Sequence, residues 1–160
     1  MTTFRRGPLL LLFSLDNRTS ELMAAHFAAA PLTPADYGVT SALRLIQPAR
    51  PTELAGALGM RPTTLSNYLN RLRTRGLVLR EPHPTDGRAA LLSLTSEGER
   101  LTGLCDPHFQ ATRDALVEAL DGLGTDTEEV TRTLETLDRA LEAATRPSRP
   151  VLREAARITG

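Results

Sequence analysis

The sequence predicts an α+β protein that is mostly α-helical. Apolar residues recur at helical spacing over most of the chain, and the spacing changes only between residues 76 and 95, where short apolar runs flank turn residues. The 160 residues are 41% hydrophobic and 24% charged, which suits one globular domain. A chain of this length can bury a core without disulfides or metal. We therefore expect residues 1–160 to form a single domain.

The first predicted helix covers residues 9–30. Projection at 100° per residue places apolar residues on one face. Arg5 and Arg6 precede an apolar run, as in a secretory leader, but the run stops after eight residues at Asp16. No stretch approaches the ~20 apolar residues of a membrane span. We expect no leader, no membrane segment and a cytoplasmic location.

Three further helices are predicted from their start signals. Thr33 is an N-cap with Pro34 at the first helical position and Asp36 at the third, and this helix reaches about residue 47. Arg50-Pro51 and Arg61-Pro62 open two short helices. Arginine is a poor N-cap, so each start forgoes about 1 kcal/mol. A bound phosphate could compensate, because helix N-termini and arginine both favour anions.

The two short helices have the spacing of a helix-turn-helix. Leu54, Ala55 and Leu58 form a short inward face, and Gly59 supplies the turn. The second helix then carries an apolar stripe made of Leu65, Tyr68, Leu69 and Leu72.

The opposite face of this second helix carries short hydrogen-bonding side chains and no acid. Its members are Thr63, Ser66, Asn67 and Asn70, with Arg71 and Arg73 at the edges. Asparagine can bond adenine bidentately, and threonine or serine can contact bases. Residues 61–92 hold six arginines against two acids, a net charge of +4, whereas residues 101–145 hold three arginines against ten acids, a net of −7. A solvated polar face is the plain alternative, but the absence of acids favours DNA contact.

A β-hairpin and two long helices complete the prediction. Residues 77–79 and 91–94 are apolar runs around a Pro-rich loop that contains Asp86-Gly87. Ser96 to Glu99 fits a capping box for a helix reaching Leu123, with a kink at Pro107. Thr125 to Glu128 caps a last helix that ends at Arg146-Pro147, and the tail, residues 146–160, is expected to be mobile. The apolar stripe of the last helix consists of Val130, Leu134, Leu137 and Leu141.

In residues 32–102 the sequence resembles the MarR (multiple antibiotic resistance regulator) family of winged helix-turn-helix transcription factors. The resemblance rests on an ordered run of residues rather than on any one of them. That run comprises Leu54-Ala55, Leu58-Gly59, Thr64-Leu65-Ser66, Arg71-Leu72, Gly76-Leu77-Val78, Arg80, Asp86-Gly87-Arg88, Leu92, Leu94-Thr95 and Gly98. Leu32 to Tyr37 also looks like the family's entry into its second helix.

The resemblance implies a homodimer with a winged helix-turn-helix lobe at residues 33–95 and dimerisation helices at residues 8–32 and 96–145. It implies that Arg88, at the tip of the hairpin or wing, enters the minor groove with Asp86 as its ion-pair partner. Asn67 stands where a basic residue is common in the family, and Arg61 where a capping serine or threonine is common. The full set of expected DNA-binding residues is Arg50, Arg61, Pro62, Thr63, Thr64, Ser66, Asn67, Asn70, Arg71, Arg73, Asp86 and Arg88.

The resemblance also implies a ligand crevice between the dimerisation helices and the DNA-binding lobe, which His26 could line. A core or interface role for His26 is the alternative. Asp106 and His108 beside Cys105 raise metal or thiol sensing, but one cysteine among leucines is more typical of a buried apolar position. No Gly-x-Ser-x-Gly or phosphate-binding glycine loop occurs, so we expect no enzyme, no cofactor and no metal.

These observations favour a ligand-responsive transcriptional regulator, a repressor, that binds palindromic double-stranded DNA as a homodimer and responds to a small-molecule effector. The rival hypothesis is a winged-helix module that binds protein and no DNA.

Overall fold

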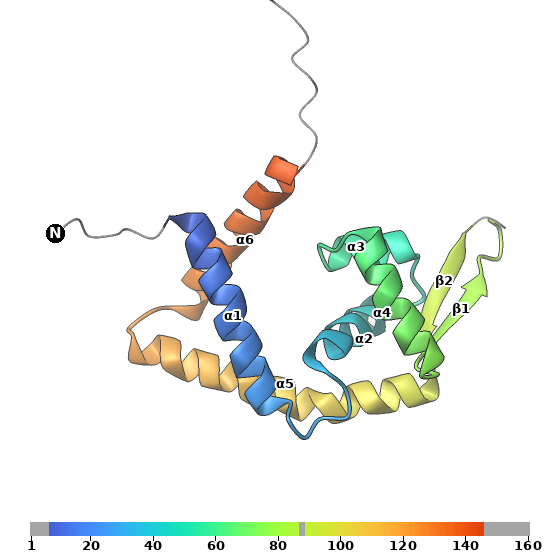
Figure 1. Ribbon diagram of the computed structural model, residues 1–160, viewed down its shortest axis with the longest axis horizontal. Helices are drawn as coiled ribbons and strands as arrows, with labels where there is room; N and C mark the ends of the chain where they lie inside the picture. Colours follow the sequence, from blue (N-terminus) through green and yellow to red (C-terminus); the bar gives the residue numbers. More distant parts are fainter. Residues whose placement is uncertain (1–6, 87–88, 146–160) are drawn as a thin grey trace, which may run out of the picture. The chain divides into compact units, whose positions relative to one another are not determined.

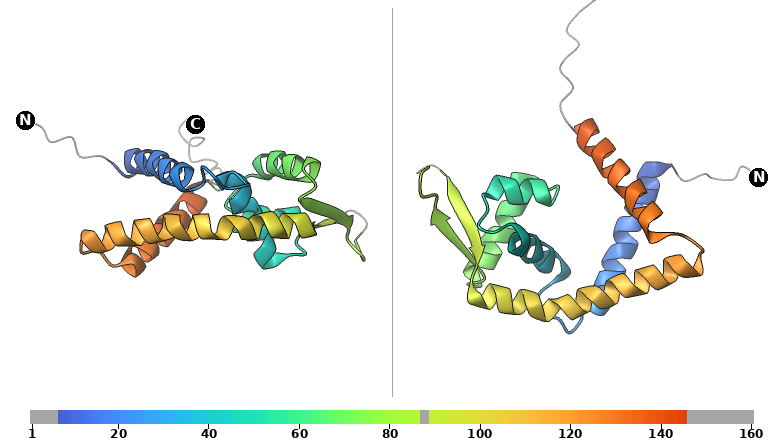
Figure 2. Two further views of the ribbon diagram at one scale, coloured as in Figure 1. Left: turned by 90° about the horizontal axis from the view of Figure 1, so that it is seen from below. Right: turned by 180° about the vertical axis from the view of Figure 1, so that it is seen from behind.

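The computed structural model describes residues 7–86 and 89–145, and these residues fall into two compact units. The boundary lies inside the long helix α5, between Asp114 and Ala115. Figure 1 labels the elements, and Figure 2 repeats them from two other sides. In order they are α1 (Pro8–His26), α2 (Pro34–Ile46), α3 (Pro51–Ala57), α4 (Pro62–Thr74), β1 (Val78–Pro82), β2 (Ala90–Leu94), α5 (Ser96–Gly122) and α6 (Thr127–Thr145).

The lobe made of α2, α3, α4 and the hairpin has its own hydrophobic core. Leucines from each element are fully buried in it. The predicted inward residues of the helix-turn-helix belong to this core, which confirms the assignment of its apolar faces. The leucines with no more than 1% exposure are Leu43, Leu54, Leu65, Leu72, Leu77 and Leu92.

Two glycines end the two helices of the helix-turn-helix. Gly59 has a φ of +60° and Gly76 a φ of +69°, values that side chains other than glycine rarely adopt. After each glycine the next amide reaches back five residues: Met60 N–H bonds Ala55 O at 2.9 Å, and Leu77 N–H bonds Leu72 O at 2.9 Å. This is the Schellman closure. The turn predicted at Gly59 is confirmed.

The hairpin is a two-stranded antiparallel sheet in which Val78 pairs with Leu94 and Arg80 with Leu92. Ala49, from the loop between α2 and α3, adds a bridge to Leu92, with bonds of 2.8 and 3.1 Å. This bridge ties the strand pair to the helices of the lobe. In both views of Figure 2 the hairpin projects beyond α4.

Two predicted caps are wrong by one residue. The N-cap of α5 is Thr95, whose Oγ1 accepts the Gly98 N–H at 2.9 Å and donates to Gly76 O at 2.8 Å. At α6 the cap is Asp126, whose Oδ1 accepts the Glu128 N–H at 2.9 Å. In each case the neighbouring side chain has the better-placed oxygen, and a Ser or Thr pattern alone does not show this.

The remaining helix predictions are close. The first helix ends at His26 rather than at residue 30, and the second begins after its Thr33 cap as expected. α5 runs unbroken through Pro107, and the kink there stays a prediction. The tail from residue 146 lies outside the described residues. Within the part of the chain that the structure describes, no helix is both long and apolar enough to cross a membrane.

Candidate nucleic-acid interface

The outer face of α4 carries the polar residues that the sequence placed there. Every one of them is exposed, and residues 61–80 contain no carboxylate that could neutralise or repel a nucleic acid. The leucines on the opposite side hold α4 against the core. The exposed members are Thr63, Thr64, Ser66, Asn67, Asn70 and Arg73.

The start of α4 is suited to an anion. Arg61 is its N-cap and Pro62 its first residue, both exposed, and no side chain caps the free amides of the first turn. A helix N-terminus with an arginine beside it favours phosphate. The prediction of an uncapped start is confirmed at this helix.

The start of α3 is arranged differently. Its N-cap, Arg50, also lacks a side-chain cap bond, but the Glu53 carboxylate accepts the Arg50 backbone N–H at 2.7 Å. This is the reverse half of a capping box. The Arg50 guanidinium lies 3.5 Å from Nε2 of His83 in the hairpin. Arg50 is exposed, and the contact with His83 places it beside the start of the hairpin loop.

A groove between α4 and β1 is lined by Asn70, Arg73 and Arg80. Arg80 was not among the predicted contacts. It pairs with Leu92, which is buried, and so its side chain stands on the sheet face that packs toward α4. Only the register of the hairpin places Arg80 on this face. That register depends on pairing between residues twelve positions apart, such as Arg80 and Leu92.

The tip of the hairpin is only partly described. Asp86 is exposed, and its backbone carbonyl accepts the Ala89 N–H at 2.9 Å. Gly87 and Arg88 lie outside the described residues, so the predicted minor-groove contact of Arg88 and its pairing with Asp86 stay predictions. At the base of the loop, Nδ1 of His83 accepts the Thr85 N–H at 3.3 Å.

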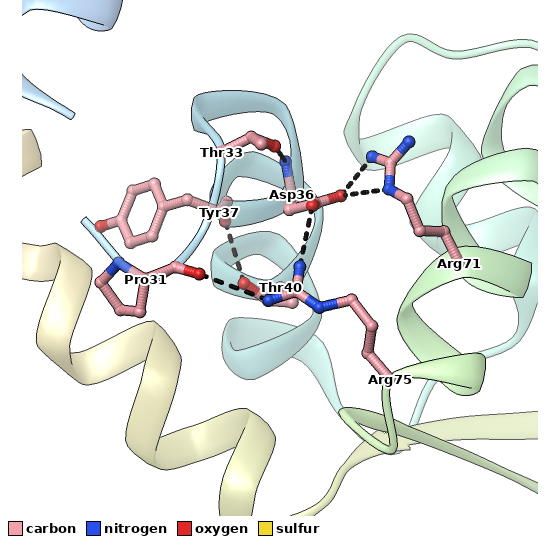
Figure 3. A network of polar contacts seen from close by, with 7 residues as sticks. All are labelled: Pro31, Thr33, Asp36, Tyr37, Thr40, Arg71 and Arg75. Carbon is pink, nitrogen blue, oxygen red and sulfur yellow. Dashed lines mark hydrogen bonds and ion pairs between the residues drawn. The ribbon is translucent and has the colours of Figure 1, made fainter. Parts of the chain in front are cut away.

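Arg71 makes a contact that the sequence reading missed. Its guanidinium bonds the carboxylate of Asp36 in α2, from Nε at 3.1 Å and also from Nη2 (Figure 3). Arg75 reaches the other oxygen of the same carboxylate at 3.2 Å. The bond to Asp36 raises the pKa of Arg71. The sequence pattern predicts Asp36 only as an acid in the first turn of α2, and no local pattern indicates two partners 35 and 39 residues away.

A second polar cluster joins α2 to α5. The Arg44 guanidinium donates two hydrogen bonds to the Asp106 carboxylate, at 2.8 and 3.0 Å. The Tyr37 hydroxyl donates a third at 2.9 Å. The Arg44 guanidinium lowers the pKa of Asp106, while burial raises the pKa of Tyr37. These contacts fix α5 against the first helix of the lobe.

The predicted ligand residue His26 is half-buried at the end of α1. Its backbone carbonyl accepts a hydrogen bond from Nδ1 of His108 at 2.8 Å, and the neighbouring Phe27 ring lies 5.8 Å from the His108 ring. Cys105 is fully buried, and burial raises the pKa of its thiol. In the described ranges, 7–86 and 89–145, no three His, Cys, Asp or Glu side chains gather in a way that could hold a metal ion.

A helix-turn-helix with a hairpin wing, a basic groove and an acid-free outer helix face defines a winged helix-turn-helix protein. The family model described as the MarR family matches residues 30–89. The chain is 27% identical over 110 residues to the multiple antibiotic resistance protein MarR of Escherichia coli, a match that covers 65% of this chain and 76% of that one. These matches make the chain similar to the MarR family over residues 30–89, which is less than half of its length.

Solved structures share the fold. The DNA complex of the Mycobacterium tuberculosis transcriptional regulator MosR aligns with a TM-score of 0.74 at 21% identity, over 88% of this chain and 99% of that one. BpsR of Bordetella bronchiseptica, whose DNA binding is regulated by 6-hydroxynicotinic acid, aligns with a TM-score of 0.73 at 20% identity, over 89% and 98%. Both likenesses confirm a winged-helix fold that is mostly helical.

Proposed function

We propose that this protein is a ligand-responsive transcriptional regulator that binds palindromic operator DNA as a homodimer. The observation that carries the proposal is the acid-free outer face of α4, bounded by Arg61 at its start and by Arg73 and Arg80 at the groove beside β1. α4 enters the major groove, where Asn67 and Asn70 read base edges.

Phosphate contacts come from the edges of this face. Arg61 and the free amides of the first turn of α4 bind one phosphate, and Arg50, beside His83 at the start of the hairpin loop, binds another. Thr63, Thr64 and Ser66 lie between the two edges and contact the DNA directly. Arg71 is left out of this set because its guanidinium bonds Asp36. Arg88, with Asp86, remains the predicted minor-groove contact of the wing.

The exposed apolar side chains of the two terminal helices support a homodimer. No residue of α1 or α6 is buried, although both helices carry large apolar side chains. A twofold dimer would cover these side chains and present two copies of α4 to an inverted repeat. The assignment of residues 8–32 and 96–145 to dimerisation is part of this proposal.

Regulation by a small molecule is supported by BpsR, a structural neighbour whose DNA binding responds to 6-hydroxynicotinic acid. His26, half-buried at the end of α1, is the residue that we propose to line the ligand site. A DNA-binding role is consistent with the cytoplasm of a prokaryotic cell, and that location is part of this proposal. It performs no chemical step, and repression follows from occupying the operator.

Binding to duplexes recovered by selection from random DNA tests the proposal. We expect an inverted repeat to be selected, and log affinity to fall steeply with log salt because counterions are released. Arg73→Gln should flatten that salt slope by about 1 for each protomer. No binding to any duplex at low salt would instead support the rival, a winged-helix module for protein partners.

Base readout has its own test. Asn70→Ala should relax discrimination at one position of each half-site by roughly 1–3 kcal/mol, with the salt slope unchanged. Asn17→Ala is the matched control, because Asn17 is exposed on α1, outside the helix-turn-helix, and its side-chain amide donates to Phe13 O. An Asn70→Ala protein that loses affinity equally for all duplexes would remove Asn70 from base readout.

A further inference from the structure

Among the residues that the structure describes, Asp36 is the one charged residue that is buried, with 1% of its surface exposed. A buried carboxylate is stable only when cations and hydrogen-bond donors surround it. Here the donors are two guanidiniums from α4 and the residue that follows it, as Figure 3 shows. The backbone N–H of Asp36 bonds Thr33 Oγ1 at 3.1 Å, so the residue itself is fixed in the first turn of α2.

The two partners lie one helical turn apart. Arg71 bonds Oδ1 and Arg75 bonds Oδ2, and Arg75 also donates to Pro31 O at 3.3 Å. Residues i and i+4 lie on one face of a helix. Two anchors separated along one face prevent α4 from rotating about its axis and from sliding along it, whereas one anchor would prevent neither. The leucines on the buried side give α4 a surface to rest on, but apolar contacts are less directional.

The position of these anchors decides where the polar face points. At 100° per residue, Arg71 and Arg75 stand at the boundary between the apolar stripe and the outer face, and Asn67 is one turn before Arg71 on the same row. Fixing Arg71 therefore fixes the direction of Asn67 and, beyond it, of Asn70. The Arg71 guanidinium also lies over the Tyr68 ring at 4.9 Å, which holds the side chain down along α4.

Without the carboxylate, two cations would stand free beside the DNA-facing surface. The side chain of Arg71 is 49% exposed and that of Arg75 is 38% exposed, so both have room to turn outward. Free arginines at such an edge would bind phosphates of any sequence. Asp36 thus holds α4 in register and withholds two charges from the DNA.

We propose that Asp36 is a positioning residue for the DNA-reading helix, which sets the orientation of α4 through Arg71 and Arg75 and keeps both arginines from binding phosphate. This inference rests on the proposed DNA-binding function. It predicts that the carboxylate raises sequence specificity rather than affinity alone.

The test compares Asp36→Asn with the wild-type chain on a selected operator and on a random duplex, across a range of salt concentrations. We expect operator affinity to fall, random-duplex affinity to rise, and the ratio of the two to shrink about tenfold or more, the size of one lost base contact. The salt slope should steepen by about 1 for each arginine that reaches a phosphate, up to four in the dimer. Glu97→Gln is the matched control, since it removes a carboxylate that pairs with Arg100 on the exposed face of α5.

Adding Arg71→Gln and Arg75→Gln to Asp36→Asn should return the salt slope and the random-duplex affinity to wild-type values. A purely structural role would lower both affinities by the same factor with an unchanged slope, and that result would overturn the inference alone. A wild-type chain that binds no duplex would overturn the proposed function and the inference together.

If Asp36→Asn does not fold, Arg71→Gln is the variant to test, because Arg75 still bonds the Asp36 carboxylate in it. We expect lower specificity with an unchanged salt slope. A slope that flattens by about 1 for each protomer would show that Arg71 itself binds phosphate, and would overturn the inference.

Discussion

The lobe built by α2, α3, α4 and the hairpin buries its own core, whereas the terminal helices α1 and α6 contain no fully buried residue. Leu54 and Leu72 have no exposed surface, while Leu9 in α1 is 75% exposed and Phe13 is 68% exposed. In the predicted stripe of α6, Leu134 is 49% exposed and Leu141 is 38% exposed, while Val130 and Leu137 are partly buried. Both regions are amphipathic in sequence. The difference teaches that an amphipathic pattern predicts that the apolar face of a helix is covered. It does not say whether the covering residues come from the same chain or from a partner.

Charging the last helix should have the largest effect. The double variant Leu137→Glu, Leu141→Glu places two charges in the stripe that we assign to the dimer interface, where an unpaired charge is costly. We expect monomers in sedimentation experiments and a loss of operator affinity of about 100-fold, because two linked half-site contacts become single ones. Arg132→Gln with Arg139→Gln changes the net charge equally on the opposite face and should leave a dimer. A folded dimer of the Leu137→Glu, Leu141→Glu chain would remove α6 from the interface.

A substitution inside the packed region should come next. A Cβ on Gly98 would lie 2.1 Å from the carbonyl oxygen of Leu77, and backbone cannot move aside cheaply. Gly98→Ala should lower the free energy of unfolding by about 1–3 kcal/mol or more, measured in urea at fixed protein concentration. Gly103→Ala, with open space around its Cβ, should be neutral or stabilising by about 0.4–1 kcal/mol. Equal effects at both glycines would mean that α5 does not pack on the lobe as described.

The cap of α5 should contribute less. Thr95→Ala removes the bond to the Gly98 N–H and the bond to Gly76 O, and should cost about 0.5–2 kcal/mol of unfolding free energy. Thr95→Ser keeps the oxygen and should cost little. If Ser96→Ala were the more damaging change in thermal melts, the capping box first predicted from the sequence would be correct after all.

The smallest effect concerns pH. Arg44 lowers the pKa of Asp106, so the folded state favours the ionised carboxyl. A lowered pKa stabilises the fold above the ordinary carboxyl pKa, and that stabilisation disappears as the pH falls through the folded-state value. Wild-type stability should therefore decline on acidification below about pH 4, and Asp106→Asn should make the decline shallower. The difference should stay below about 1 kcal/mol, since Asp106 is 39% exposed and solvent screens the pair.

Asp114→Asn is the control for this measurement, because Asp114 pairs with Arg113 on the surface of α5. An identical pH dependence of unfolding in wild type and Asp106→Asn would show that the Arg44 pair contributes nothing to the connection between α2 and α5.

Much of the fold could be predicted because its signals are local. A helix start depends on residues within about three positions, a Schellman turn on a glycine, and an apolar stripe on spacing within one element. The helix starts at Pro34, Pro51 and Pro62 are confirmed for this reason. The caps at Thr95 and Asp126 were missed because several neighbouring oxygens compete for one amide, and only the path of the chain decides between them.

The sequence by itself determined the helix-turn-helix, the hairpin and the identity of the polar residues on the outer face of α4, since each follows from periodicity and turn chemistry. Only the tertiary structure decided what two of the arginines do. Arg71 looked like one more basic residue at the edge of that face, but it bonds Asp36, which is 35 residues earlier, and Arg80 enters the groove because of its pairing with Leu92. Electrostatic partners act through space, and the distances between residues far apart in a chain exist only after the core has brought their elements together.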